Sequence, residues 1–190
     1  MKTNHLYQLV ERLGELLKVD ARQAGAVEGL QPVQLEVLNY LSCCNKFSDT
    51  PMAVTEYLGQ TKGTVSQTIK TLENKGLVNK VPDENDKRIS HIKVTEAGHD
   101  ILRINIPTKM FTNACHDLSI NQQEKISEAL NQLLFSLIKS NDMKSFGVCH
   151  SCRHNQKHSD GRFFCALVKQ PLSHEDVQLL CKEHEWIKVD

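Results

Sequence analysis

The stretch that decides the fold is TKGTVSQTIKTLENKGLV, residues 61–78. Thr61 is a typical helix N-cap, and the glycine near the end of the stretch is typical of the position just beyond a helix. Val65, Ile69 and Leu72 recur at helical spacing and should face one side. The remaining positions carry hydroxyls, amides and lysines. The stretch therefore predicts an amphipathic helix over 61–75 with an apolar stripe and a polar, basic outer face.

The segments on either side of this helix complete a recognisable order. A short helix is predicted over 52–59, where a glycine ends it. Two short strands are predicted over 77–81 and 89–94, joined by a charged, turn-rich tip at 82–88. A helix, a turn, a polar helix and a two-stranded hairpin make the plan of a winged helix-turn-helix.

Further helices are predicted outside this unit. One follows Thr95 and either stops at about Ile106 or continues across Pro107 to Ala114. Another begins at a capping box, in which a serine precedes a glutamine by three residues. Residues 45–51 form a polar loop. The helical ranges are 5–26, 31–44, the segment after Thr95, and a long last helix from Ser119 that carries apolar residues through Ile138.

These elements define a fold class and a division into domains. We expect a mainly α protein with a small β-hairpin wing, dimerisation helices and a small metal-stapled C-terminal extension. The first domain spans 1–145, with the winged part at about 31–94. The second spans 146–190 and is a cysteine-rich metal-binding tail. The chain has 190 residues, which suits two such units.

The charge distribution supports a nucleic-acid partner. The formal net charge is zero, which by itself argues neither for nor against DNA. Residues 61–80 nevertheless hold four lysines and one glutamate, whereas residues 1–60 hold five cations and seven anions. The neutral total therefore hides a basic face. The alternative is an ordinary amphipathic surface helix, which would not explain why helix order, hairpin and charge agree.

Three pieces of the chain resemble the MarR family of bacterial transcription regulators. Residues 61–78 are similar to the family's recognition helix. DENDKR, residues 83–88, is similar to its wing, and VTEAG, residues 94–98, resembles the run that follows the wing. The resemblance covers roughly residues 5–140. It implies a homodimer on a pseudo-palindromic double-stranded DNA operator, and a small-molecule effector bound between the dimer helices and the winged domain.

In such a homodimer the first and last helices of each subunit would interlock. The apolar stripes at Leu6–Leu17 and Ile126–Ile138 fit that role. The alternative is that these stripes pack within a single chain.

The candidate DNA contacts divide by chemistry. Short hydroxyl and amide side chains suit base edges and groove walls, lysines suit phosphates, and the wing tip suits the minor groove. Asp86 would orient one of the two wing cations. A lysine stands at 87 where the family often has arginine, so which wing cation enters the groove stays open. The candidates are Thr61, Thr64, Ser66, Gln67 and Thr68, then Lys62, Lys70 and Lys75, then Lys87 and Arg88.

Four cysteines in the last 42 residues are spaced for a metal centre: Cys149-x₂-Cys152-x₁₂-Cys165-x₁₅-Cys181. A Cys-x₂-Cys pair can supply two bonds to one metal, and a unit this small usually needs a staple. Zn²⁺ on four cysteines, or on three plus His184, is one hypothesis. An iron–sulfur cluster is the second, and four unliganded thiols are the third. Zinc would make the tail structural, whereas a cluster would make it a redox or iron sensor.

The remaining features limit the function. The N-terminus lacks the apolar core of a signal peptide, and no run of 18 apolar residues exists, so we expect a cytoplasmic protein with reduced thiols and no membrane span. Four thiolates would saturate a zinc ion and no nucleophile–base pair stands out, so we do not expect an enzyme. We expect a sequence-specific DNA-binding transcription regulator. The alternative is a protein-interaction adaptor with a structural zinc tail and no DNA binding.

Overall fold

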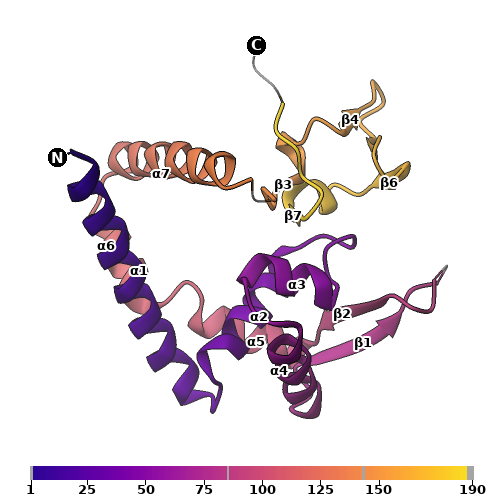
Figure 1. The fold of residues 1–190 in the computed structure, drawn as a ribbon, viewed down its shortest axis with the longest axis horizontal. Coiled ribbons are helices and arrows are strands. Elements are labelled where there is room, and N and C mark those ends of the chain that lie inside the picture. Colours follow the sequence, from indigo (N-terminus) through magenta and orange to yellow (C-terminus); the bar gives the residue numbers. More distant parts are fainter. Residues whose placement is uncertain (1, 85, 143, 188–190) are drawn as a thin grey trace.

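The computed structural model describes residues 2–84, 86–142 and 144–187 (Figure 1). The N-terminal part contains helices and one hairpin, and the C-terminal part contains short strands with two 3₁₀ turns. The elements are α1 Lys2–Val27, α2 Pro32–Cys43, α3 Pro51–Leu58, α4 Lys62–Asn74, β1 Val78–Pro82, β2 Ser90–Val94, α5 Glu96–Asn105, α6 Lys109–His116, α7 Ile120–Ser140, β3 Gly147–Val148, β4 Asn155–Lys157, β5 Phe163–Cys165, β6 Gln170–Leu172 and β7 Leu180–Cys181.

The helices α2 to α5 and the wing β1–β2 share one apolar core, which we call the head. The strands are antiparallel, with Val78 opposite Val94 and Pro82 opposite Ser90. The stripe predicted on α4 lies in this core, and its three members are at most 1 % exposed. Removing such side chains from water is what holds the helix to its scaffold. The buried side chains include Leu35, Val37, Leu38, Val54, Val65, Ile69, Leu72, Val78 and Ile92.

Local signals set the ends of the helices. The Thr61 hydroxyl accepts a hydrogen bond from the Thr64 N–H, and Ser119 and Gln122 form the predicted capping box. The helix is interrupted around Pro107, so α5 ends at Asn105 and α6 begins at Lys109. The alternative of one helix running on to Ala114 was therefore wrong, because proline has no N–H to donate within a helix.

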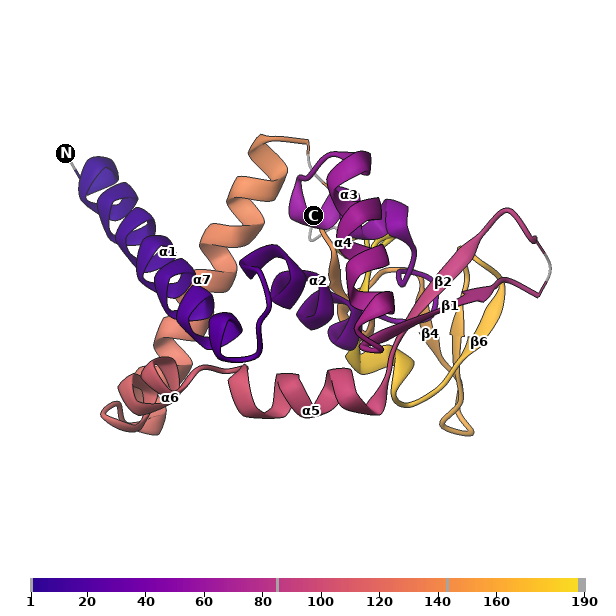
Figure 2. The ribbon, with the colours of Figure 1, turned by 90° about the horizontal axis from the view of Figure 1, so that it is seen from below.

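Helices α6 and α7 and the N-terminal part of α1 extend away from the head, whereas the C-terminal end of α1 contacts α2 (Figures 1 and 2). Leucines along α1 are 38–51 % exposed, and α7 has no buried residue at all. The part of the chain that the structure describes therefore leaves the predicted stripes largely uncovered. Among the described residues, none of the helices is long and apolar enough to cross a membrane.

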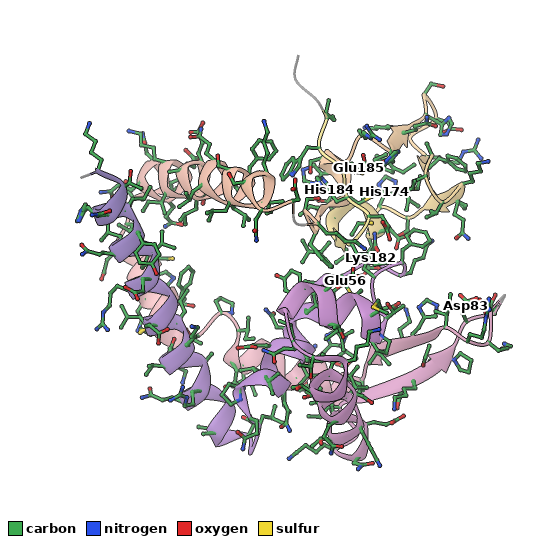
Figure 3. The ribbon with its side chains drawn as sticks, viewed as in Figure 1. Glu56, Asp83, His174, Lys182, His184 and Glu185 are labelled. Atoms are coloured by element: carbon green, nitrogen blue, oxygen red, sulfur yellow. The ribbon has the colours of Figure 1, made fainter. Side chains whose placement is uncertain are left out.

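The tail is a small unit of short strands beside α3 (Figure 1). β3 pairs with β7, and β4, β5 and β6 form an antiparallel sheet. Lys144 Nζ lies 2.9 Å from Glu56 Oε2, and the Phe146 ring packs edge-on against Tyr40 and Tyr57. Figure 3 labels Glu56 on α3 and Lys182 in the tail, on the two sides of this junction. The tail thus packs directly on the head.

Candidate nucleic-acid interface and cysteine cluster

The outer face of α4 carries the predicted groove-facing side chains. Thr61, Thr64, Ser66 and Gln67 are exposed, on the side opposite the buried stripe. The Thr61 and Thr64 hydroxyls lie 2.9 Å apart, so both sit at the helix N-terminus. There the unpaired backbone N–H groups and the helix dipole favour an anion such as a phosphate.

Thr68 is buried, unlike the other side chains that were predicted to face the DNA groove. Its side chain is only 6 % exposed, because it follows Val65 by one turn of α4 and lies on the core side with it. It therefore does not belong to the groove-facing set, although its residue type suggested that it did.

The lysines of α4 differ in how free they are. Lys62 and Lys70 are exposed on the outer face. Lys75, just after the helix, donates from Nζ to the Gly29 carbonyl at 3.2 Å, which ties it to the α1–α2 connection. Lys62 and Lys70 are accordingly better placed than Lys75 to reach phosphates.

At the wing tip, Asp86 orients Arg88. Arg88 Nε and Nη2 donate to the Asp86 carboxylate at 2.9 and 2.7 Å, and the Arg88 side chain remains 90 % exposed. The pKa of Asp86 is lowered by these hydrogen bonds. Lys87 instead donates from Nζ to the Asp83 carbonyl at 3.0 Å. The Asp86 carboxylate therefore orients the planar Arg88 guanidinium, which stays exposed, whereas the ammonium group of Lys87 is hydrogen-bonded to the backbone.

The base of the wing is fastened to the loop between α2 and α3. The Ile92 N–H donates to the Asp49 carbonyl at 2.7 Å, and the buried Asp49 carboxylate contacts His91 Nδ1 and Lys93 Nζ. His91 Nε2 lies 3.0 Å from Asp83 Oδ2, nearer the tip (Figure 3). The orientation of the wing therefore depends on this loop.

The four tail cysteines gather around one small core. Cys149, Cys152 and Cys181 are buried, and the partly buried Cys165 packs against the small core that contains Cys149 and Cys181. Burial raises the pKa of the Cys149 thiol to about 12, and the nearby Cys181, Cys152 and Cys165 push it the same way. The four sulfurs are thus close enough to act on one another electrostatically.

The four cysteines are nevertheless not spaced like the ligands of a bound metal ion. Among the described residues, no group of three or more His, Cys, Asp or Glu side chains is arranged to hold a metal. His184 is buried, with Nδ1 at 2.8 Å from the Ser145 hydroxyl and Nε2 at 2.9 Å from the Ser151 hydroxyl. Since serines engage both ring nitrogens, His184 is not offered as a ligand in this geometry, and the metal centre stays a prediction.

The loop between α2 and α3 also holds the tail, which the sequence did not indicate. The Asn45 N–H donates to the Leu180 carbonyl at 2.8 Å, and the Lys182 N–H donates to Ser48 Oγ at 2.9 Å. Lys46 Nζ lies 3.1 Å from Asp176 Oδ2. We call residues 44–50 the bridging loop, because the wing and the tail are both attached to it. The sequence predicted only a polar loop here, whereas the structure buries Asn45, Ser48 and Asp49.

A cavity of about 910 Å³ lies between the wing and the tail. Apolar side chains such as Phe47, Met52 and Ile89 line it together with charged groups that include Lys46 and Glu183. It is not at the place where an effector was predicted, between the dimer helices and the winged domain. The effector therefore remains a prediction.

Comparison with known proteins finds a similarity that includes part of the head. A sequence model of the MarR family matches residues 28–89. These residues, which include the α4 helix and part of the wing, therefore resemble the winged-helix domain of that family. The tail lies outside the matched stretch.

Known proteins extend the similarity beyond these residues. The transcriptional repressor MprA of Escherichia coli K12 is 24 % identical over 134 residues, which is 68 % of this chain and 70 % of MprA. The S. aureus MepR–DNA complex is 25 % identical, with a TM-score of 0.56 over 68 % of this chain and 96 % of that one. A MarR regulator from Methanosarcina mazei Go1 gives a TM-score of 0.60 at 19 % identity, over 72 % and 98 %.

MprA and the M. mazei protein are transcriptional regulators by name, which agrees with the expectation that this chain is a regulator rather than an enzyme.

Proposed function

We propose that the protein is a homodimeric transcription regulator that binds a double-stranded DNA operator through α4 and the wing. The observation that carries this is the outward face of α4, where hydroxyl, amide and lysine side chains stand opposite a fully buried stripe. MepR, which shares the fold at 25 % identity, has been solved bound to DNA. In a two-fold dimer the α4 helices would enter successive major grooves of a pseudo-palindromic site.

Each contact has a distinct physical task. Ser66 and Gln67 are placed to read base edges, because their donors and acceptors are exposed on α4. Lys62 and Lys70 neutralise phosphates, and Arg88 enters the minor groove beside them. The Asp86 carboxylate keeps the guanidinium extended before DNA arrives, so less side-chain freedom is lost on binding.

Lys62→Ala, Lys70→Ala and Arg88→Ala combined should weaken binding to the DNA upstream of the protein's own gene. Each lost phosphate contact removes about 0.9 from the slope of log affinity against log salt concentration, so the slope should fall by about 2 to 3. A mobility-shift or anisotropy titration across a salt series measures both quantities.

The matched control is Lys109→Ala, Lys125→Ala and Lys139→Ala, which removes three exposed cations from α6 and α7. It should leave the slope nearly unchanged. If the α4 and wing variant binds the duplex as tightly as the unaltered protein at every salt concentration, the protein is not a DNA-binding regulator of this kind. An adaptor function would then be the better account.

We also propose that the four tail thiolates hold a metal centre, either Zn²⁺ or an iron–sulfur cluster. Support comes from the small tail core, which contains Cys149 and Cys181 with Cys165 packed against it, and whose size suits a metal staple. Because both ring nitrogens of His184 are engaged by serines, a shell of four cysteines is favoured over three plus His184. Because the described cysteines are not arranged to hold a metal, they would have to move to close the shell.

Metal analysis and an absorption spectrum of protein purified without oxygen test this. About one zinc per colourless chain indicates a structural site, and a brown protein with thiolate–iron absorption indicates a cluster. Cys152→Ser should release the metal, whereas Cys115→Ser, in α6 outside the tail, should retain it. Full metal content in the Cys152→Ser variant would show that the proposed shell is wrong.

A further inference from the structure

His91 lies on β2 between the bridging loop and the wing tip, and a carboxylate faces each of its two ring nitrogens. Nδ1 contacts Asp49 Oδ1, and Nε2 lies 3.0 Å from Asp83 Oδ2. An ionised carboxylate can only accept hydrogen bonds, so both ring nitrogens have to donate. Only the imidazolium ring carries two N–H donors. The arrangement therefore fits the charged form of His91.

Loss of its proton would leave His91 with one N–H for two carboxylates. The side chain of Asp49 is 4 % exposed, whereas that of Asp83 is 26 % exposed. Because a buried carboxylate is costly to leave without a donor, the remaining N–H should stay with Asp49. The lone pair of Nε2 would then face the Asp83 carboxylate, and both groups are acceptors. Deprotonation should therefore break the bond between His91 and Asp83.

Asp83 also shapes the turn at the wing tip. Its Oδ1 accepts a hydrogen bond from the Asp86 N–H at 2.8 Å, while Oδ2 faces His91. The Asp86 carboxylate in turn accepts from Arg88 Nε and Nη2 at 2.9 and 2.7 Å. A chain of hydrogen bonds thus joins the bridging loop to the exposed guanidinium, through Asp49, His91, Asp83, Asp86 and Arg88.

We propose that protonated His91 positions the wing tip for DNA, so that the contribution of Arg88 to operator affinity weakens when His91 loses its proton. His91 is a positioning residue in this role, because it acts on the DNA through Arg88. A guanidinium on a loosened turn loses more conformational freedom when it binds, and that loss lowers affinity. The inference rests on the DNA-binding function proposed above.

The charged groups around the ring set the pH range of this effect. Burial and the nearby Lys93 oppose the charge of His91, but the hydrogen bonds to Asp49 and Asp83 outweigh them, so the pKa of His91 is raised. The wing contact should be complete below the ordinary value of about 6.5 and lost as the pH rises through the raised pKa. The cavity beside His91 holds further charged side chains from the wing, the bridging loop and the tail: Glu84, Arg88, Lys46, Lys182 and Glu183.

The affinity of the whole chain for the duplex upstream of its own gene tests the inference. Fluorescence anisotropy at pH 6 and pH 8.5, at constant ionic strength, gives the two dissociation constants. The unaltered protein should bind roughly two- to tenfold more weakly at pH 8.5, the range expected for one hydrogen bond. His91→Gln and Arg88→Ala should each remove most of this pH dependence, because one removes the proton and the other removes the group that it positions.

Asp83→Asn separates the proton from the contact that it makes. Its side-chain oxygen can still accept from the Asp86 N–H, while its amide can donate to the lone pair of neutral His91. This variant should therefore bind at pH 8.5 at least as tightly as at pH 6. The matched control is His116→Gln, at an exposed histidine on α6, and it should keep the full pH dependence.

Three results would overturn the role of His91: an unaltered protein whose affinity does not change with pH, a His91→Gln variant that keeps the pH dependence, or an Asp83→Asn variant that weakens at pH 8.5 as the unaltered protein does. If His91→Gln does not fold, the comparison of Asp83→Asn with the unaltered protein decides. A chain that binds the duplex at neither pH, even at low salt, would instead overturn the DNA-binding function itself.

Discussion

His91 illustrates how a single side chain holds the wing. It stands between two carboxylates, Asp49 on the bridging loop and Asp83 near the wing tip. Lys93 also contacts Asp49. Burial opposes the charged imidazolium, but the hydrogen bonds to Asp49 and Asp83 outweigh it, so the pKa of His91 is raised. Since folding favours the protonated form, His91 stabilises the head most fully below its unfolded pKa of about 6.5.

This stabilisation should be lost as the pH rises through the folded pKa of His91, which lies above that value. We therefore expect the His91→Gln variant to have a lower free energy of unfolding than the unaltered protein. The difference should be larger at pH 6 than at pH 8.5. Urea unfolding across this range measures the difference. Asp83→Asn, which removes one carboxylate, should reduce the pH dependence. A difference that stays constant with pH would show that His91 is not stabilised in its charged form.

Single residues also show what the sequence could and could not predict. The Thr61 cap and the stripe of Val65, Ile69 and Leu72 follow from local spacing, and the structure confirms them. Thr68 was misplaced because a threonine suits a groove as well as the rim of a core, and only its neighbours decide. Asn45 was missed for a related reason: its burial depends on a partner segment 135 residues away in the chain, at Leu180.

At the scale of elements, prediction succeeded where each element carries its own signals. The helices α3 and α4 and the two wing strands match the predicted ranges to within a residue or two, because caps, glycines and alternation are local. The strands of the tail carry no such signals, being two or three residues long. Pairing with distant segments, such as Val148 opposite Leu180, defines them instead. The fold of the tail is thus a tertiary property.

The whole molecule brings the tail, the bridging loop and the wing into one connected unit. Asn45 and Ser48 contact the segment around Cys181, and Asp49 of the same loop holds the wing. The tail also contacts α7, because the Trp186 ring packs edge-on against Phe135 of that helix at a centroid distance of 5.2 Å. A change at the cysteines would therefore act on the head and on α7 together, which is the arrangement that coupling between two sites requires.

Helices α1 and α7 each carry a row of exposed apolar side chains. Leu13 is 51 % exposed and Leu134 is 55 % exposed, in rows that no described part of the chain covers. Burying such rows against a second copy would remove them from water, with roughly 25 cal/mol gained per Å². We therefore expect a stable dimer, and Leu13→Glu should dissociate it, because a carboxylate would have to be buried unpaired.

Sedimentation or light scattering gives the mass directly. Gln8→Glu adds the same charge on the opposite side of α1, beside Glu11, and should remain dimeric. The Leu13→Glu variant should also bind operator DNA far more weakly, since each monomer reads only one half-site and the gain from joining two heads is lost. A monomeric unaltered protein, or a Leu13→Glu variant that stays dimeric, would show that these faces do not form the interface.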